Sequence, residues 1–225
     1  MKKSLIILAL ILLVVVVAFW YAKQKTSHVF SPYTSTALHD REVQLDPASQ
    51  KIFDARIAAT KKSIAAFNKD TSTDDKVSNY FNLAGDEQAL GHYQEAKKAF
   101  EAALLIKHDA HITHAYAALL YQMGAGVDAF LYLDEAIKEA PEVPNFWQTK
   151  IQIAQELYKN DADRLEEVYL DGLTQTKEDI DLLTLYATYL ANAGRREESI
   201  LYWKKAITKN PTASSAYQAA IDALK

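Results

Sequence analysis

The sequence predicts an all-α protein: a solenoid of helix-turn-helix repeats that follows one apolar N-terminal segment. Three observations predict this class. Of 225 residues, 49% are hydrophobic, whereas only 6 are Gly and 5 are Pro, which favours long helices over sheets with many turns. One motif recurs four times at a spacing near 34 residues. A single run of 18 residues without a charge lies near the start.

The first element is the run from Leu5 to Ala22, which the sequence predicts to be a transmembrane helix. At about 1.5 Å per residue it covers roughly 27 Å, close to the thickness of a bilayer core. Lysines precede it, and Trp20 and Tyr21 lie near its end, where aromatic side chains favour lipid headgroups. We therefore expect a membrane anchor over residues 1–25, with Leu5, Trp20 and Tyr21 among its membrane contacts.

The alternative for this segment is a cleaved signal peptide, which would leave a secreted or periplasmic adaptor. Signal peptides have an apolar core of about 7 to 15 residues and end in a small-x-small site. The one candidate site, Val16-Val17-Ala18, lies inside the apolar run, so an uncleaved anchor is favoured.

The orientation of the anchor is predicted from its short N-terminal tail, which most easily stays in the cytoplasm. The Lys-Lys start followed by an apolar run resembles bacterial single-pass anchors. We expect a single-pass protein of the bacterial inner (plasma) membrane whose C-terminal body is extracytoplasmic.

A linker and a capping helix are expected next. Residues 26–45 show no period of 2 or 3.6 and predict a linker. Asp46-Pro47 then supplies a helix N-cap followed by Pro in the first turn. The sequence predicts an amphipathic helix over residues 46–70 that packs on the solenoid, because it cannot bury its apolar face alone. The residues on that face are Ile52, Phe53, Ile57, Ile64 and Phe67.

The repeats are identified by three columns of residues that share one irregular spacing. Successive members of each column lie 33, 36 and 34 residues apart, a coincidence that chance does not explain. The first and third columns consist mostly of small residues, and the second of large ones. The columns are Ala96, Ala129, Leu165 and Ser199; Phe100, Leu133, Tyr169 and Trp203; and Ala103, Ala136, Gly172 and Ala206.

Glycine and proline mark the ends of the helices within this pattern. A glycine stands at the turn between the two helices of three units, and a proline stops two of the units before the next begins. The third unit differs, because it has Asn160-Asp161 at the turn and about two extra residues. The glycines are Gly91, Gly124 and Gly194, and the prolines are Pro141 and Pro211.

These residues resemble the tetratricopeptide repeat (TPR) family, whose unit is a helix-turn-helix of about 34 residues. The resemblance covers residues 74–225, about two-thirds of the chain. It implies a right-handed TPR solenoid in which neighbouring repeats bury one another's faces. About four repeats are expected, with a C-terminal cap helix. Their ranges are about 77–109, 110–143, 144–179 and 180–213, and the cap is 212–225.

The resemblance also implies a binding surface, because the first helix of each TPR unit lines a concave groove. Carried over by alignment, this groove is neutral and polar with aromatic side chains. It would suit an amphipathic helix or an extended peptide of a partner protein. The residues expected to bind the partner are Phe81, His111, His114, Tyr121, Gln148, Gln152, Gln155, Thr184 and Thr188.

Composition and motifs exclude several functions. The net charge is −4, and the first 25 residues carry four lysines and no acid, so the rest of the chain has a charge of −8. An acidic body argues against nucleic acid as a partner. No cysteine, Gly-rich phosphate loop, G-x-S-x-G or H-E-x-x-H motif is present. We therefore expect no enzyme activity, catalytic residue or cofactor. The expected partners are other proteins and the membrane, and self-association of this chain is a further expected interaction.

One histidine cluster is a candidate metal site. It contains His108, His111 and His114, with Asp109 between them. Residues three apart on a helix are rotated by about 60° from superposition, so the three rings are not expected to converge on one ion. The sequence predicts no metal site, and a transition-metal site at His111 and His114 is the alternative.

Overall fold

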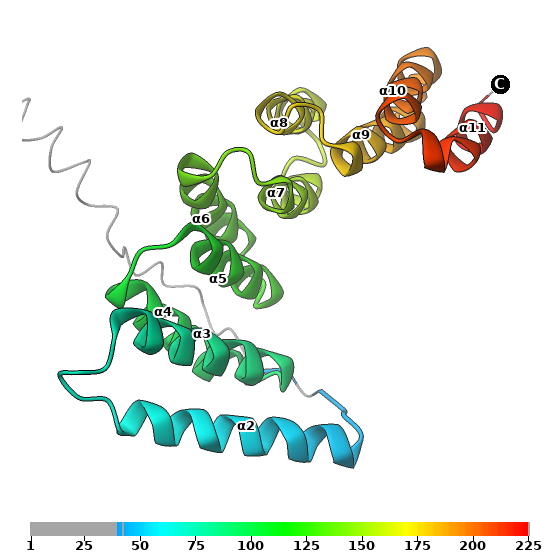
Figure 1. The fold of residues 1–225 in the computed structure, drawn as a ribbon. Helices are drawn as coiled ribbons and strands as arrows, with labels where there is room; N and C mark the ends of the chain where they lie inside the picture. The colour runs from blue at the N-terminus through cyan, green and yellow to red at the C-terminus, as the bar shows by residue number, and fades with distance from the viewer. Residues whose placement is uncertain (1–39, 42, 225) are drawn as a thin grey trace, which may run out of the picture. The chain divides into compact units, whose positions relative to one another are not determined.

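The described part of the protein is all-helical. The computed structural model describes residues 40–41 and 43–224, so the predicted anchor and most of the predicted linker lie outside it. It contains ten α-helices, α2 to α11, and a short 3-10 helix, with no strand in these residue ranges (Figure 1). The all-α prediction is confirmed. Among the described residues, no helix is long and apolar enough to cross a membrane.

The helices follow one another with short connections. After α2 they form four pairs; we call α3, α5, α7 and α9 the first helices and α4, α6, α8 and α10 the second helices. The bounds are α2 (Pro47–Ala65), α3 (Thr73–Ala89), α4 (Tyr93–Ile106), α5 (Ala110–Gln122), α6 (Gly126–Glu139), α7 (Pro144–Leu157), α8 (Ala162–Gln175), α9 (Ile180–Asn192), α10 (Arg196–Lys209), the 3-10 helix η1 (Pro211–Ala213) and α11 (Ser214–Asp222).

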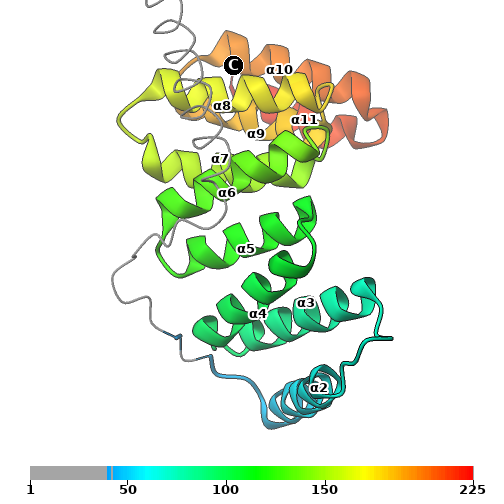
Figure 2. The same ribbon diagram turned by 90° about the vertical axis from the view of Figure 1, so that its left-hand side faces the viewer.

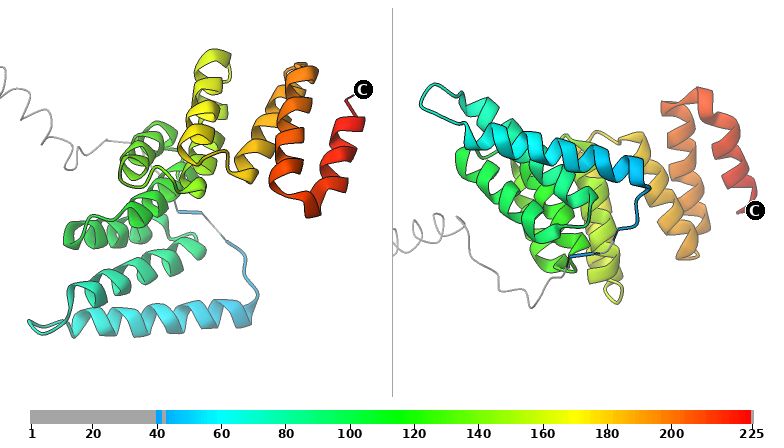
Figure 3. Two further views of the ribbon diagram at one scale, coloured as in Figure 1. Left: turned by 45° about the horizontal axis from the view of Figure 1, so that its top comes forward. Right: turned by 90° about the horizontal axis from the view of Figure 1, so that it is seen from below.

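Packing joins each helix to its neighbours along the chain. Every helix from α2 to α11 contacts the next, and the first helices of neighbouring units also touch, α5 with α7 and α7 with α9. Figure 2 shows successive pairs stacked in chain order, and Figure 3 shows α2 alongside the first pair. The first helices therefore form one surface across several units.

The three sequence columns lie in the core. All small members of the first and third columns are buried, and Phe100, Leu133 and Tyr169 of the second are at most 1% exposed. Gly172 lies so close to the Trp147 ring that a Cβ would be 3.2 Å from its Cε3 atom, so this column needs a very small residue. Trp203 is half-buried and stacks on Tyr217 of α11, with 5.7 Å between ring centroids. The last helix thus covers part of the final unit.

The glycine turns of the first, second and fourth units are Schellman motifs, in which a residue with positive φ ends the helix. Gly91, Gly124 and Gly194 have φ of 78°, 85° and 78°. At the first, the N–H of His92 bonds the carbonyl of Glu87 at 2.9 Å, and the other two turns repeat this bond. Glycine adopts this conformation without the Cβ strain of other residues.

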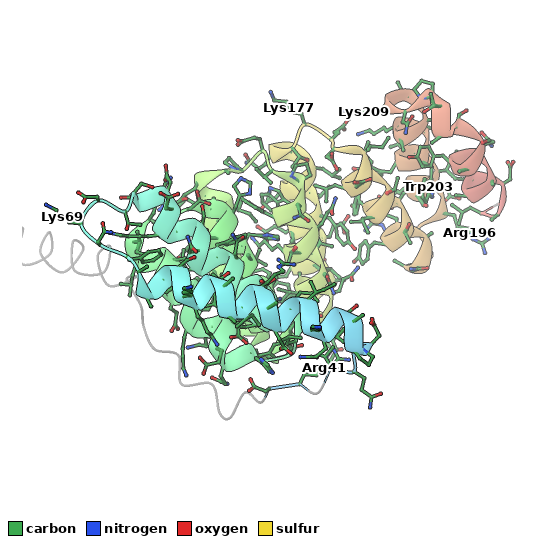
Figure 4. The ribbon with its side chains drawn as sticks, turned by 60° about the horizontal axis from the view of Figure 1, so that its bottom comes forward. Arg41, Lys69, Lys177, Arg196, Trp203 and Lys209 are labelled. Carbon is green, nitrogen blue, oxygen red and sulfur yellow. The ribbon has the colours of Figure 1, made fainter. Side chains whose placement is uncertain are left out.

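The third unit ends its first helix differently. Helix α7 has 14 residues where α5 and α9 have 13, and the four-residue turn 158–161 has no positive φ. Asp161 instead caps α8, accepting a hydrogen bond from the Arg164 N–H at 3.2 Å. A Schellman turn without glycine follows α8, at Lys177 with φ of 55°. Lys209 Nζ donates to the Lys177 carbonyl at 2.5 Å, and Figure 4 shows the two residues near each other.

Residues 40, 41 and 43–45 fall in the range expected to be a linker, and they contact the first unit. The Arg41 N–H donates to the Gly91 carbonyl at 2.9 Å, and Asp40 Oδ1 accepts from the Gln94 N–H at 2.9 Å. Leu45 packs against the buried core. The Asp40 carboxylate therefore caps the start of α4, which no side chain of residue 92 caps. We call these five residues the N-terminal segment.

Helix α2 is held on α3 by apolar contacts of Phe53, Ile57 and Ile64 with the core and by two ion pairs. Of its residues only Ile57 is buried, and Ile52, expected on the apolar face, is 59% exposed. Arg56 pairs with Asp86 at 2.7 Å and Lys61 with Glu87 at 2.8 Å. Both carboxylates are almost fully buried, and burial is the main cause that raises the pKa of Asp86. A buried charge without a partner is costly, so the cations of α2 stabilise these two carboxylates.

Two glycine substitutions test the docking of the N-terminal segment. A Cβ on Gly91 would lie 1.9 Å from the Arg41 carbonyl oxygen, whereas one on Gly124 would meet nothing within 4 Å. Both Gly→Ala changes strain a left-handed residue at a cost of about 1–2 kcal/mol. We expect Gly91→Ala to lower the free energy of unfolding in urea further, and to speed trypsin cleavage after Arg41. Equal losses and unchanged cleavage in both variants would contradict the docking.

Candidate partner-binding face

The nine residues predicted to bind a partner all lie on first helices. Phe81 is on α3, three are on α5, three on α7 and two on α9. Each is exposed or half-buried, so all remain accessible to a partner in the described structure. We call the surface formed by these nine residues the first-helix face.

Side-chain hydrogen bonds join consecutive first helices at this face. Four such bonds occur among the described residues, and each links residues 33 to 35 positions apart, one repeat along the chain. We call this series the ladder. Its pairs are Gln88 Nε2 to Gln122 Oε1 (3.0 Å), His114 Nε2 with Thr149 Oγ1 (2.9 Å), Tyr121 OH to Glu156, and Gln148 Nε2 to Asp181 Oδ2 (3.3 Å).

The ladder contains three of the predicted residues and five that were missed. The predicted residues form hydrogen bonds with Thr149, Glu156 and Asp181, which were not predicted. One unit earlier, Gln88 forms a hydrogen bond with Gln122, and neither of these was predicted. A signal for the missed residues exists in the sequence, because Gln122 and Glu156 are 34 positions apart and each follows a predicted residue. Repeat spacing alone does not show which column faces the neighbouring helix.

The other predicted residues make more local contacts. Gln152 hydrogen-bonds the Tyr121 hydroxyl, and Gln155 Nε2 donates to the Tyr169 hydroxyl at 2.7 Å. Phe81 packs edge-on against Phe100, with 5.8 Å between ring centroids. The hydroxyls of Thr184 and Thr188 donate to carbonyls within α9 at 2.9 and 2.8 Å. Phe81 and the two threonines are therefore not joined to the ladder.

The charged members of the ladder are carboxylates. Glu156 and Asp181 belong to it, and none of its eight residues is Lys or Arg. The hydrogen bond that the Tyr121 hydroxyl donates to Glu156 is the main cause that raises the pKa of this tyrosine. The face thus offers amides, hydroxyls and acids to a partner, with no fixed positive charge in the ladder.

The two histidines of α5 pack on one aromatic ring. The rings of His111 and His114 lie 5.3 and 4.8 Å from Phe146, one edge-on and the other stacked. His114 also bonds Thr149, while His108 is 2.5 Å from Glu139. Burial lowers the pKa of His114, and the nearby His111 adds to this effect. Within the described ranges, no group of three or more His, Cys, Asp or Glu is placed to hold a metal ion.

A hollow of about 630 Å³ adjoins the first-helix face where α5 and α7 end. Tyr121 and Gln155 of the predicted set line it, as do Glu156 and Leu157. Its other wall is the start of α6, from Gly126 to Val127, with Gly124 of the preceding turn. The hollow therefore continues the face toward the α5–α6 turn.

Comparison with known proteins identifies the fold. No protein-family model matches the chain, and no curated protein does. Among solved structures, MamA has a TM-score of 0.58 at 16% identity over 77% of this chain and 99% of its own. YrrB, a TPR protein with an unusual peptide-binding site, has a TM-score of 0.52 at 17% identity, covering 77% and 86%. A TPR protein from Parabacteroides merdae gives 0.57 at 18%, covering 79% and 69%. The chain has the TPR fold that its repeats predict.

The pH dependence of stability tests the surroundings of His114. Its pKa in the folded protein is below the ordinary 6.5, so the unfolded chain binds its proton more readily. Its neutral form is therefore favoured by folding, and stability falls as the pH drops below about 6.5. We expect the free energy of urea unfolding to fall more between pH 7.5 and 5.5 in the parent than in His114→Gln. Identical pH slopes would show that His114 is not buried as described.

Proposed function

We propose that this chain is a membrane-anchored interaction scaffold that binds a peptide or helix of another protein on the first-helix face, and that it catalyses no reaction. The ladder is the observation that carries the proposal. It gathers hydrogen-bonding side chains from four consecutive units on an accessible surface, with exposed Gln152 beside the half-buried Tyr121 of the ladder. When a partner binds, these groups can replace the hydrogen bonds they make to one another with hydrogen bonds to the partner's backbone. The net free-energy cost of binding then stays small.

The fold supports this proposal by analogy. YrrB, which shares the fold, is a TPR protein with an unusual peptide-binding site. A shared fold does not carry a partner from one protein to another, so the argument for this chain rests on its own side chains. We propose no metal-dependent role for His111 and His114, since both rings pack on Phe146 and His114 shares a hydrogen bond with Thr149.

Membrane anchoring is the second part of the proposal, and the sequence of residues 5–22 supports it. The run is long enough to span a bilayer and has aromatic residues near its end. We place the C-terminal body on the extracytoplasmic side of a bacterial inner membrane, where the scaffold would serve assembly of an envelope complex. A secreted adaptor is distinguished from this protein by its mature N-terminus, near residue 19 in place of Met1.

Crosslinking in native membranes tests the scaffold. The full chain carrying Tyr121→Ala and Gln152→Ala should lose partners that the parent captures, because the change removes a hydroxyl of the ladder and an exposed amide of the first-helix face. Residues 37–225, which form one compact unit, should capture the same partners without the membrane fraction. Mass spectrometry of the crosslinked proteins measures both effects.

The matched control for this experiment is Leu105→Ser on α4, a second helix. Leu105 is 74% exposed, so the change adds a surface substitution away from the first-helix face and leaves the core intact. Thermal melts should be similar for both variants. If the double variant keeps every partner, or the Leu105 variant loses them equally, binding by the first-helix face is wrong.

A further inference from the structure

The hollow beside α6 lies where another unit places an aromatic ring. Gly126 is the first residue of α6, and the first residues of the other second helices are Tyr93, Ala162 and Arg196. The Tyr93 side chain is only 5% exposed, so its ring is enclosed in the first unit. In the second unit the corresponding residue has no side chain, and the hollow of about 630 Å³ lies there.

The walls of the hollow suit an apolar ring. A Cβ on Gly126 would meet a single neighbour, Leu157 Cδ2 at 3.8 Å, which is an ordinary van der Waals distance. Val127 is 63% exposed and Leu157 38% exposed, so two aliphatic side chains at this place are left without cover. Glu156 and Lys159 give the lining one charge of each sign. Apolar contact, more than net charge, therefore decides what fits.

The first unit also shows how a chain crosses such a turn. At Gly91 the N-terminal segment donates the Arg41 N–H to the glycine carbonyl, and Asp40 caps the helix that follows. The equivalent turn at Gly124 has a similar φ, but a Cβ there would meet nothing within 4 Å. The start of α6 receives no side-chain cap from its own N-cap residue, Ala125. The second turn thus presents the same backbone geometry without a covering segment from the described chain.

We propose that the α5–α6 turn binds an extended segment of a partner protein whose aromatic side chain occupies the hollow at Gly126. The segment crosses Gly124 as the N-terminal segment crosses Gly91, and its ring takes the place that the Tyr93 ring has in the first unit. This inference rests on the proposed function, because Tyr121 and Glu156 at the hollow belong to the first-helix face and its ladder. It adds the position and chemical class of the anchoring residue.

Filling the hollow from within tests this assignment. Gly126→Phe places an aromatic side chain in the hollow, and the Cβ has room, so the protein should fold with a melting temperature equal to or above that of the parent. Ala162→Phe is the matched control, since it adds the same ring at the corresponding, exposed first residue of α8. The full chain in mild detergent is used to select binders from a phage-displayed library of random 12-residue peptides.

We expect the enriched peptides to share an aromatic residue. Their affinity, measured by fluorescence anisotropy, should fall at least about tenfold for Gly126→Phe, as for loss of an aromatic anchor, and less than about twofold for Ala162→Phe. Peptides without an aromatic residue, or with unchanged affinity for Gly126→Phe, would overturn the inference. If peptides of this second kind nevertheless bind the Tyr121 and Gln152 double variant more weakly than the parent, binding by the first-helix face is supported and only the role of the hollow is wrong. If no peptide is enriched, both proposals fail.

Discussion

Close approach of helices through small residues is the constraint on which the rest of this protein depends. Ala96, Ala103, Ala129 and Ala136 are fully buried, and Gly172 lies directly against Trp147. No unit of this kind buries its apolar faces alone, so stability comes from contacts between neighbours. Larger residues in these columns would overpack the core at about 1–3 kcal/mol each. The same approach brings consecutive first helices within hydrogen-bonding reach, and the ladder follows from it.

The sequence predicts the features that repeat, because each of them recurs at one spacing. The columns and the turn glycines identify the fold, and the missing glycine of the third unit marks the turn that differs. Features that occur once were not predictable. The docking of Asp40 and Arg41 at the first turn joins residues about 50 positions apart without a sequence pattern. The positive φ of Lys177 was not predictable either, because no glycine marks this turn in the sequence.

The candidate site also has one part that the sequence predicts and one part that it does not. Its residues were predicted from the alignment of units, and they do lie on the first helices. Their partners were missed because contact across units depends on which of two adjacent columns faces the neighbour, as with Gln155 and Glu156. The hollow at Gly126 arises where one unit departs from another, so it emerges only when the enclosed Tyr93 of the first unit is compared with it. Repetition builds the surface, and a local departure from the repeat produces the hollow at Gly126.

Hydrogen–deuterium exchange of the full chain, alone and with its crosslinked partner, tests most directly whether the first helices form the binding surface. We expect slower exchange of amides in α5 and α7 on binding, with α8 and α10 unchanged. Slower exchange confined to the second helices, with α5 and α7 unaffected, would contradict it.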